Sequence, residues 1–223
     1  MSFSPNTSLL FDLDGTLVDS LRDIAESMNA ILARWSCPTH PVEAYNTFVG
    51  DGMMILAERV LPKDIRNRPE KLSACVTEMR TEYADRWRRH SRPYPGITDL
   101  LTLCASHGIR MGILSNKPEP FTKEMVSHFF PQVPFATVRG AREGVPVKPD
   151  PTAAIEIQQA WESSASAIAY VGDTDTDMKT GRAAGFYTVG VSWGFRTRDE
   201  LSAQGADCII DTPSELVTLL NIR

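Results

Sequence analysis

Short, nearly continuous apolar runs separated by helix-sized segments constrain the fold of this chain more than any other feature of its sequence. The runs span residues 8–13, 109–114, 135–138, 167–172, 188–191 and 208–210. Strands that are buried on both faces are apolar throughout, whereas half-buried strands alternate polar and apolar residues. Strands that alternate with helices favour a parallel sheet covered on both faces. The sequence therefore predicts an α/β fold.

The segments between these runs carry helix signals. We expect helices over residues 97–106, closed by Gly108, and over residues 118–130. A third is expected over residues 150–161, with Asp150 as the N-cap and Pro151 at the first helical position.

Residues 19–92 interrupt the alternation. Two stretches there repeat apolar residues at helical spacing, namely Leu21, Ile24, Met28, Ile31, Leu32 and Trp35, and later Leu72, Cys75, Val76, Met79, Tyr83 and Trp87. Residues 49–61 suggest a helix between them. We predict a helical domain over residues 19–91, inserted into an α/β core of residues 1–18 and 92–223. Pro93, Pro95 and Gly96 mark the return to the core.

Composition excludes several classes of function. The 223 residues suffice for one sizeable core and a modest second domain. A net charge of -5 does not indicate binding to nucleic acid or to a membrane, so an anionic substrate would need local positive charge. The scattered cysteines favour buried, reduced thiols rather than a zinc site or disulfides. No signal peptide or membrane span is evident, and we expect a cytoplasmic protein.

Two carboxylates end the first predicted strand. Asp12 and Asp14 follow its apolar residues, and Gly15 permits a sharp turn. Ligands of open α/β sheets bind beyond the carboxyl ends of the strands, so these aspartates are candidate functional groups. The alternative is a turn with two solvated aspartates.

A second acidic cluster follows the predicted strand at residues 167–172. If that strand neighbours the first, Asp173 converges with Asp12 and Asp14, and such oxygen ligands suit Mg²⁺. Asp175 is expected to cap the following helix. For Asp177 the alternatives are a helix cap and a supporting role beside the metal ligands, and we favour the second.

Two further positions suit a phosphate group. Ser115 and Asn116 follow the strand predicted at residues 109–114, where a hydroxyl and a backbone N–H can hold phosphoryl oxygens. Lys148 precedes the predicted helix at residue 150. Taken separately, the first pair is typical of a turn and the lysine of a solvated surface.

Together these segments resemble the four ordered motifs of the haloacid dehalogenase superfamily. They are residues 11–20 (FDLDGTLVDS), 115–118 (SNKP), 148–150 (KPD) and 172–177 (GDTDTD). The resemblance spans essentially the whole chain and implies a Rossmann-like core with an inserted helical cap domain. Residues 49–52 (VGDG), 93–96 (PYPG), 115–118 and 190–194 (GVSWG) look most like the phosphoglycolate phosphatase branch.

The resemblance implies a Mg²⁺-dependent phosphatase. In it, Asp12 attacks phosphorus and forms an aspartyl-phosphate, and Asp14 acts as the general acid and then the general base. The implied Mg²⁺ ligands are the side chains of Asp12 and Asp173 and the backbone carbonyl of Asp14, with Asp177 behind them. The implied phosphate ligands are Ser115, Lys148 and the N–H groups of Leu13 and Asn116. Dehalogenases of the superfamily lack the counterpart of Asp14, which favours phosphoryl transfer.

The substrate is less constrained. The branch resemblance favours 2-phosphoglycolate, whereas pyrophosphate and nucleotide monophosphates stay open. There are three alternatives to a phosphatase: a phosphosugar mutase, a phosphonate-cleaving enzyme that uses Lys63 or Lys71, and a non-catalytic module. Gly50, Asp51 and Gly52 form either a substrate-specificity loop or a plain turn, and the basic run at residues 86–92 is expected to be a solvated helix end. We expect a monomer or a small homo-oligomer.

Overall fold

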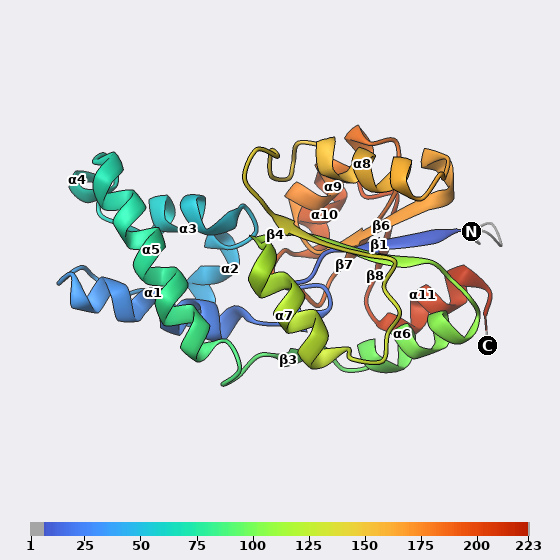
Figure 1. The fold of residues 1–223 in the computed structure, drawn as a ribbon, viewed down its shortest axis with the longest axis horizontal. Coiled ribbons are helices and arrows are strands. Elements are labelled where there is room, and N and C mark those ends of the chain that lie inside the picture. Colours follow the sequence, from blue (N-terminus) through green and yellow to red (C-terminus); the bar gives the residue numbers. More distant parts are fainter. Residues whose placement is uncertain (1–6, 223) are drawn as a thin grey trace. The chain divides into compact units, whose positions relative to one another are not determined.

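The chain divides into two units in the computed structural model, which describes residues 7–222 (Figure 1). One unit, called here the α/β unit, comprises residues 7–18 and 93–222. The other, the helical unit, comprises residues 19–92. Arg92, which the sequence analysis assigned to the core, belongs to the helical unit.

The α/β unit is built on a parallel sheet of six strands, in the order β5-β4-β1-β6-β7-β8. The strands are β1 (Ser8–Phe11), β4 (Met111–Pro118), β5 (Thr137–Ala141), β6 (Ile168–Gly172), β7 (Tyr187–Val191) and β8 (Cys208–Ile210). Each coincides with a predicted apolar run or overlaps it. The α/β prediction is therefore confirmed.

Strand β4 differs from its prediction in length. It continues through Pro118, and its pairing with β5 shifts register between Leu114 and Pro118. Ser115 and Asn116 therefore lie within an irregular part of the strand, not in a turn after it. The misjudged boundary reflects their polar side chains, which break the apolar run although both residues are buried.

Helices cover both faces of this sheet. They are α6 (Ile97–Ser106), α7 (Glu119–Phe129), α8 (Thr152–Ala160), α9 (Asp175–Ala183), α10 (Arg198–Ala203) and α11 (Pro213–Leu220), with a 3-10 turn η2 (Ala165–Ala167). Figure 1 shows α8, α9 and α10 on one face and α6 and α11 on the other. Ala154, Ile157 and Trp161 pack with Leu10 of β1 and Tyr170 of β6 in one buried cluster.

The start of α8 is a correction. Asp150 was expected to be the N-cap and Pro151 the first helical residue, but the helix begins one residue later, at Thr152, with Pro151 as the N-cap. The Asp150 carboxylate, one residue before the N-cap, still accepts a hydrogen bond of 2.9 Å from the N–H of Thr152. It therefore satisfies one of the free N–H donors of the first helical turn.

The helical unit contains α1 (Leu21–Arg34), α2 (Tyr45–Phe48), α3 (Gly52–Val60), α4 (Lys63–Arg66) and α5 (Pro69–Arg86), with a 3-10 turn η1 (Val42–Ala44). The long helices α1 and α5 pack together. The residues that the helical periodicity selected are buried, except Leu21 and Trp35, which are half-buried. The chain enters and leaves this unit through β2 (Val18–Asp19) and β3 (Arg92–Pro93), which pair as a two-stranded sheet.

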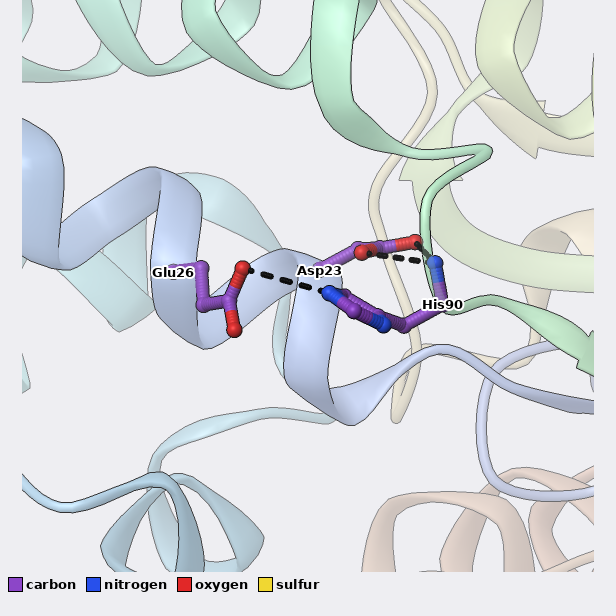
Figure 2. A group of neighbouring side chains, drawn as sticks. All are labelled: Asp23, Glu26 and His90. Carbon is purple, nitrogen blue, oxygen red and sulfur yellow. Dashed lines mark hydrogen bonds and ion pairs between the residues drawn. The ribbon is translucent and has the colours of Figure 1, made fainter.

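A buried carboxylate ties the two ends of the helical unit together (Figure 2). Asp23, in the first turn of α1, accepts hydrogen bonds from the N–H groups of His90 and Ser91 and from the Ser91 hydroxyl, at 2.8 to 3.1 Å. Nε2 of His90 lies 3.6 Å from Glu26. Since both oxygens of Asp23 accept protein N–H or O–H groups, we interpret this cluster as a structural clasp.

Two expectations about composition can be compared with the structure. Cys37, Cys75 and Cys104 are buried free thiols, whereas Cys208 is only half-buried, so the prediction of burial fails there. Among residues 7–222, no helix combines the length and apolar character needed to cross a membrane.

Candidate functional site

The carboxyl ends of three neighbouring strands define the candidate site. Strand β1 lies between β4 and β6, with Phe11 in register with Ile113 on one side and with Val171 on the other. The residues that follow these positions therefore come together at one edge of the sheet. The structure brings together all the site residues that the sequence predicted in the α/β unit: Asp12, Leu13, Asp14, Ser115, Asn116, Lys148, Asp173 and Asp177.

Asp12 is the central carboxylate of this edge. Its Oδ1 accepts a hydrogen bond of 2.7 Å from the N–H of Leu13 and lies 3.0 Å from Nζ of Lys148. Burial raises the pKa of Asp12 to about 7. Lys148 and the Leu13 N–H oppose this shift, and the charges of Asp177 and Asp14 add to it. The Leu13 N–H, expected to face a phosphoryl oxygen, is here directed at Asp12.

Lys148 is a buried cation and not a solvated one. Its side chain is 1% exposed, and Nζ lies 3.0 Å from Asp12 and 2.7 Å from Oδ1 of Asp177. Burial by itself would lower its pKa. The charges of the two aspartates outweigh this effect and raise the pKa well above its usual value. The side chain is therefore a permanent positive charge beside Asp12.

Asp177 caps a helix, which is one of the two alternatives that the sequence left open, while its supporting role beside the metal ligands stays a prediction. It is the N3 residue of a capping box with Thr174, because its Oδ2 accepts from the Thr174 N–H at 3.0 Å and from the Thr174 hydroxyl at 2.7 Å. Its Oδ1 binds Lys148 and lies 3.3 Å from the hydroxyl of Tyr170. Thr174, and not Asp175, is the N-cap of α9; Asp175 forms an ion pair with Lys179 instead.

Asp173 is enclosed by backbone and hydroxyl groups. Its Oδ1 accepts from the Thr16 hydroxyl at 2.9 Å, and its Oδ2 accepts from the Phe195 N–H at 2.8 Å. Burial and the charges of Asp177 and Asp12 raise its pKa well above the usual range. Gly15, with a φ of +82°, passes so close that a Cβ there would lie 2.2 Å from Oδ2. The motif therefore needs glycine at this turn.

The loop after β7 is a part of the site that the sequence analysis missed. Phe195 binds Asp173 through its backbone, and the indole N–H of Trp193 donates a 3.0 Å hydrogen bond to the Thr16 carbonyl. The loop therefore joins the segment after β1 to the segment after β6. The backbone contact of Phe195 leaves no residue-type signal, and a tryptophan at position 193 does not by itself indicate a partner at Thr16, so only the folded structure reveals the two contacts.

The side chain of Asn116 forms two hydrogen bonds with the backbone of Lys148. Its side-chain amide donates a 2.9 Å hydrogen bond to the Lys148 carbonyl, and its Oδ1 accepts a 2.8 Å hydrogen bond from the Lys148 N–H. This reciprocal pair fixes the backbone that carries the buried lysine. Asn116 was expected to offer its backbone N–H to a phosphoryl oxygen, and its position in the sequence does not indicate this contact with Lys148. The Ser115 hydroxyl accepts from the Lys117 N–H at 3.2 Å.

Lys117 is a second buried cation that the sequence analysis left out. Its side chain is 4% exposed, and Nζ lies 2.9 Å from Oδ2 of Asp14. The available signal was a lysine followed directly by Pro118 at the end of an apolar run. A lysine in such a position is ordinarily interpreted as a solvated residue at the end of a strand.

The donor set fits a hard divalent cation. Asp12, Asp173 and Asp177 each offer a carboxylate oxygen, and these atoms lie within 4.8 Å of one another. Asp177 already accepts three hydrogen bonds of 3.0 Å or less, which leaves Asp12 and Asp173 as the better ligands. With Asp14, four carboxylates face the two ammonium groups of Lys117 and Lys148. When all are ionised, the six side chains carry an excess of two negative charges, which Mg²⁺ would neutralise.

The predicted loop of Gly50, Asp51 and Gly52 lies in the helical unit. Asp51 is held in an ion pair with Arg59, which also donates a 2.9 Å hydrogen bond to the Phe48 carbonyl. Both glycines have positive φ, at 127° and 87°. The loop is thus a fixed turn in front of α3, and a contact with substrate stays a prediction.

Comparison with known proteins gives a family match and full-length relatives. Residues 9–191 match the family model described as haloacid dehalogenase-like hydrolase. A phosphoglycolate phosphatase of Haemophilus influenzae (strain Rd) is 27% identical over 215 residues, covering 94% of this chain and 96% of the relative. A phosphoglycolate phosphatase of Aquifex aeolicus is 29% identical over 213 residues, covering 96% of each chain.

Solved structures share the fold over nearly the whole chain. A crystal structure from Lactobacillus delbrueckii subsp. bulgaricus superimposes with a TM-score of 0.90 at 24% identity, covering 99% of both chains. A hydrolase of the haloacid dehalogenase-like family from Streptococcus pneumoniae gives a TM-score of 0.85 at 24% identity, covering 95% of this chain and 97% of that one. At this level of identity the likeness concerns the fold alone.

Proposed function

Since the chain belongs to the haloacid dehalogenase-like hydrolases and is a phosphatase of that family, we propose that it hydrolyses a small phosphomonoester with Mg²⁺ and an aspartyl-phosphate on Asp12. The observation that carries this proposal is the ion pair of 3.0 Å between the buried carboxylate of Asp12 and Lys148. A carboxylate in this surrounding is desolvated, oriented and next to a fixed cation. These are the properties that an attacking group on phosphorus needs.

In the first step, a carboxylate oxygen of Asp12 attacks phosphorus, and the bond from phosphorus to the substrate oxygen breaks. Asp14 gives its proton to the leaving alkoxide. The two aspartates are separated by one residue and lie on a turn that Gly15 sharpens. In the second step, water attacks the phosphorus, Asp14 takes a proton from that water, and the bond to Asp12 breaks. Orthophosphate leaves and the carboxylate of Asp12 is restored.

Asp12, Asp173 and the backbone carbonyl of Asp14 would hold the Mg²⁺ ion. When bound, the ion supplies positive charge that reduces the repulsion between a carboxylate nucleophile and a phosphate dianion. The excess negative charge of the site and the raised pKa values of Asp12 and Asp173 support this assignment. Asp177 is proposed to hold Lys148 rather than the ion, because its Oδ1 accepts from Nζ at 2.7 Å.

Lys148, the Ser115 hydroxyl and the N–H groups of Leu13 and Asn116 are proposed to bind the phosphoryl oxygens. Lys148 is well suited, because Asn116 fixes its backbone and Asp177 fixes its ammonium group. The Leu13 N–H would move from Asp12 to the phosphoryl group when the substrate binds, since it donates to Oδ1 of Asp12 here.

The proposed substrate is 2-phosphoglycolate. The curated relatives of comparable length that carry the name phosphoglycolate phosphatase support it, at 27% and 29% identity. The helical unit is proposed as a cap that selects the substrate, with Gly50, Asp51 and Gly52 as its specificity loop. Action as a monomer or small homo-oligomer and a cytoplasmic location stay predictions.

The test is phosphate release from a panel of substrates, with Mg²⁺ and with a chelator. The panel contains 2-phosphoglycolate, pyrophosphate, nucleoside monophosphates and a hexose phosphate, and the control is Asp12→Asn. Metal-dependent release that the variant lacks is expected, with the highest kcat/KM for 2-phosphoglycolate. A higher value for another member would replace the substrate. Isomerisation of the hexose phosphate without phosphate release would favour a mutase.

A further inference from the structure

The ion pair between Lys117 and Asp14 is not used by the mechanism above. Nζ of Lys117 lies 2.9 Å from Oδ2 of Asp14, and the lysine side chain is 4% exposed while the aspartate is 12% exposed. Charge-assisted hydrogen bonds in such surroundings restrict both partners more firmly than exposed ion pairs do. An orienting contact therefore acts on the carboxylate that exchanges protons in the proposed reaction.

Two features hold Lys117 itself in place. It lies in β4, where its N–H donates to the Ser115 hydroxyl at 3.2 Å and its carbonyl accepts from the Thr122 hydroxyl at 3.1 Å. The backbone of this lysine is thus fixed between the strand and the first turn of α7. Asp14, by contrast, belongs to a tight turn outside the sheet, with an isolated bridge to Val18. Because two side-chain hydroxyls hold the backbone of Lys117, its ammonium group can orient the Asp14 carboxylate.

We propose that Lys117 is a positioning residue for Asp14 and that it acts mainly in hydrolysis of the aspartyl-phosphate. This inference rests on the proposed function. In that step, the water oxygen bonds to phosphorus, the bond between phosphorus and Asp12 breaks, and a water proton passes to the carboxylate of Asp14. Lys117 fixes one oxygen of that carboxylate and so the direction in which it accepts the proton. A misdirected base slows this step even when every reacting group is present.

The two steps can be separated with p-nitrophenyl phosphate as the probe. Its leaving group departs as p-nitrophenolate without a proton, so formation of the phospho-enzyme does not depend on proton transfer from the Asp14 side chain. Rapid mixing with Mg²⁺ measures this step as a burst of p-nitrophenolate, and the following steady state measures hydrolysis. Lys117→Met is expected to keep the burst rate within about threefold and to lower the steady-state rate about 10- to 100-fold. The phospho-enzyme should then accumulate to nearly one per chain.

The control variant is Lys123→Met. Lys123 pairs with Glu119 at 2.6 Å on the surface, with 53% of its side chain exposed, and this change should leave both phases as in the wild type. Lys117→Arg keeps the positive charge and should restore part of the steady-state rate. If Lys117→Met does not reach the wild-type melting temperature, Lys117→Gln replaces it in the experiment. It is likewise expected to keep the burst rate and to lower the steady-state rate.

The outcomes are distinguishable. Equal losses in burst and steady state, with no accumulated phospho-enzyme, would overturn the role of Lys117 while leaving the phosphatase proposal intact. So would an unchanged steady-state rate in the folded variant. Folded wild-type protein without burst or turnover on any phosphate ester would instead overturn the proposed function, and this inference with it.

Discussion

Nζ of Lys148 lies 2.7 Å from Oδ1 of Asp177, and the two side chains are 1% and 0% exposed. The lysine comes from the segment before α8, and the aspartate from the first turn of α9. The same ammonium group lies 3.0 Å from Asp12, so the cation is shared between a carboxylate that caps a helix and the proposed nucleophile. Lys148 is therefore expected to contribute both to the stability of the fold, through Asp177, and to the proposed reaction, through Asp12.

Lys148→Ala should therefore nearly abolish turnover. At about 4 Å and an effective dielectric near 20, one pair of unit charges is worth roughly 4 kcal/mol, so loss of the cation exposes the phosphate to repulsion from Asp12. We expect kcat to fall by about 1,000-fold or more. Steady-state phosphate release measures it. The control is Lys179→Ala, because Lys179 pairs with Asp175 at 2.7 Å but is 49% exposed. Near-normal hydrolysis by Lys148→Ala would remove the lysine from the mechanism.

Asp14→Asn should retain phosphate binding and lose turnover. The amide has nearly the same shape but can neither give a proton to an alkoxide nor take one from water. We expect kcat for 2-phosphoglycolate to fall about 100- to 10,000-fold, with Kd for inorganic phosphate changed less than about threefold. Calorimetry with phosphate and Mg²⁺ gives the second value. An active Asp14→Asn variant would contradict the acid and base role.

Gly194→Ala should weaken Mg²⁺ binding. A Cβ there would lie 2.3 Å from Cβ of Asp173 and 2.5 Å from its Oδ2, so the carboxylate would have to move. Displacing a metal ligand through its neighbours typically lowers metal affinity about 10- to 100-fold. Titration calorimetry of the metal-free protein measures this directly. The control is Gly108→Asn, because a Cβ there would meet no heavy atom of residues 7–222 within 4 Å, its chain neighbours aside, and asparagine tolerates its φ of +67°. Equal Mg²⁺ affinity in both variants would mean that the loop does not orient Asp173.

The pH dependence of stability should report on Asp12 in the metal-free protein. Its pKa is raised to about 7 in the folded chain, whereas the unfolded carboxyl titrates near about 3.9. Between these values the folded state keeps a proton that the unfolded state has lost. The contribution of Asp12 to the free energy of unfolding therefore declines as pH rises from about 4 to about 7 and is flat above.

Asp12→Asn should flatten this decline. Urea unfolding in chelator at several pH values compares the variant with the wild type, and added Mg²⁺ should reduce the decline in the wild type. If the slopes of wild type and variant coincide, Asp12 does not titrate in this range.

Asp23→Ala should destabilise the protein through the clasp shown in Figure 2. The change removes the acceptor of the buried Ser91 N–H and of the half-buried His90 N–H. We expect a loss of about 2–4 kcal/mol in the free energy of unfolding, measured by urea denaturation. Glu26→Gln is the matched control, because its contact with His90 is longer, at 3.6 Å, and partly exposed. It should cost less than about 1 kcal/mol. Equal losses in both variants would contradict the clasp.

Periodicity predicted elements better than their ends. Strand β8 and helix α6 agree with the predicted ranges, because apolar runs and a closing glycine mark them locally. The end of β4 and the start of α8 do not. At the end of β4, Asn116 is hydrogen-bonded to Lys148, which is distant in the sequence. At the start of α8, Asp150 binds the N–H of Thr152 from the preceding turn. These contacts override the local propensity.

The sequence by itself determined which groups lie at the edge of the sheet. Asp12, Ser115 and Asp173 each follow a run of buried residues, and parallel strands bring such positions to one edge. The residue types of the motifs and their order along the chain then identify the haloacid dehalogenase-like hydrolase family.

Only the tertiary structure decided how these groups are paired. It assigned Lys148 to Asp12 and Asp177, Lys117 to Asp14, and the Phe195 N–H to Asp173. The physical reason is that pairing among buried charges depends on distances of about 3 Å between segments far apart in sequence, where a small shift changes the partner. A backbone N–H, moreover, is present at almost every residue, so its use in a site leaves no trace in the sequence.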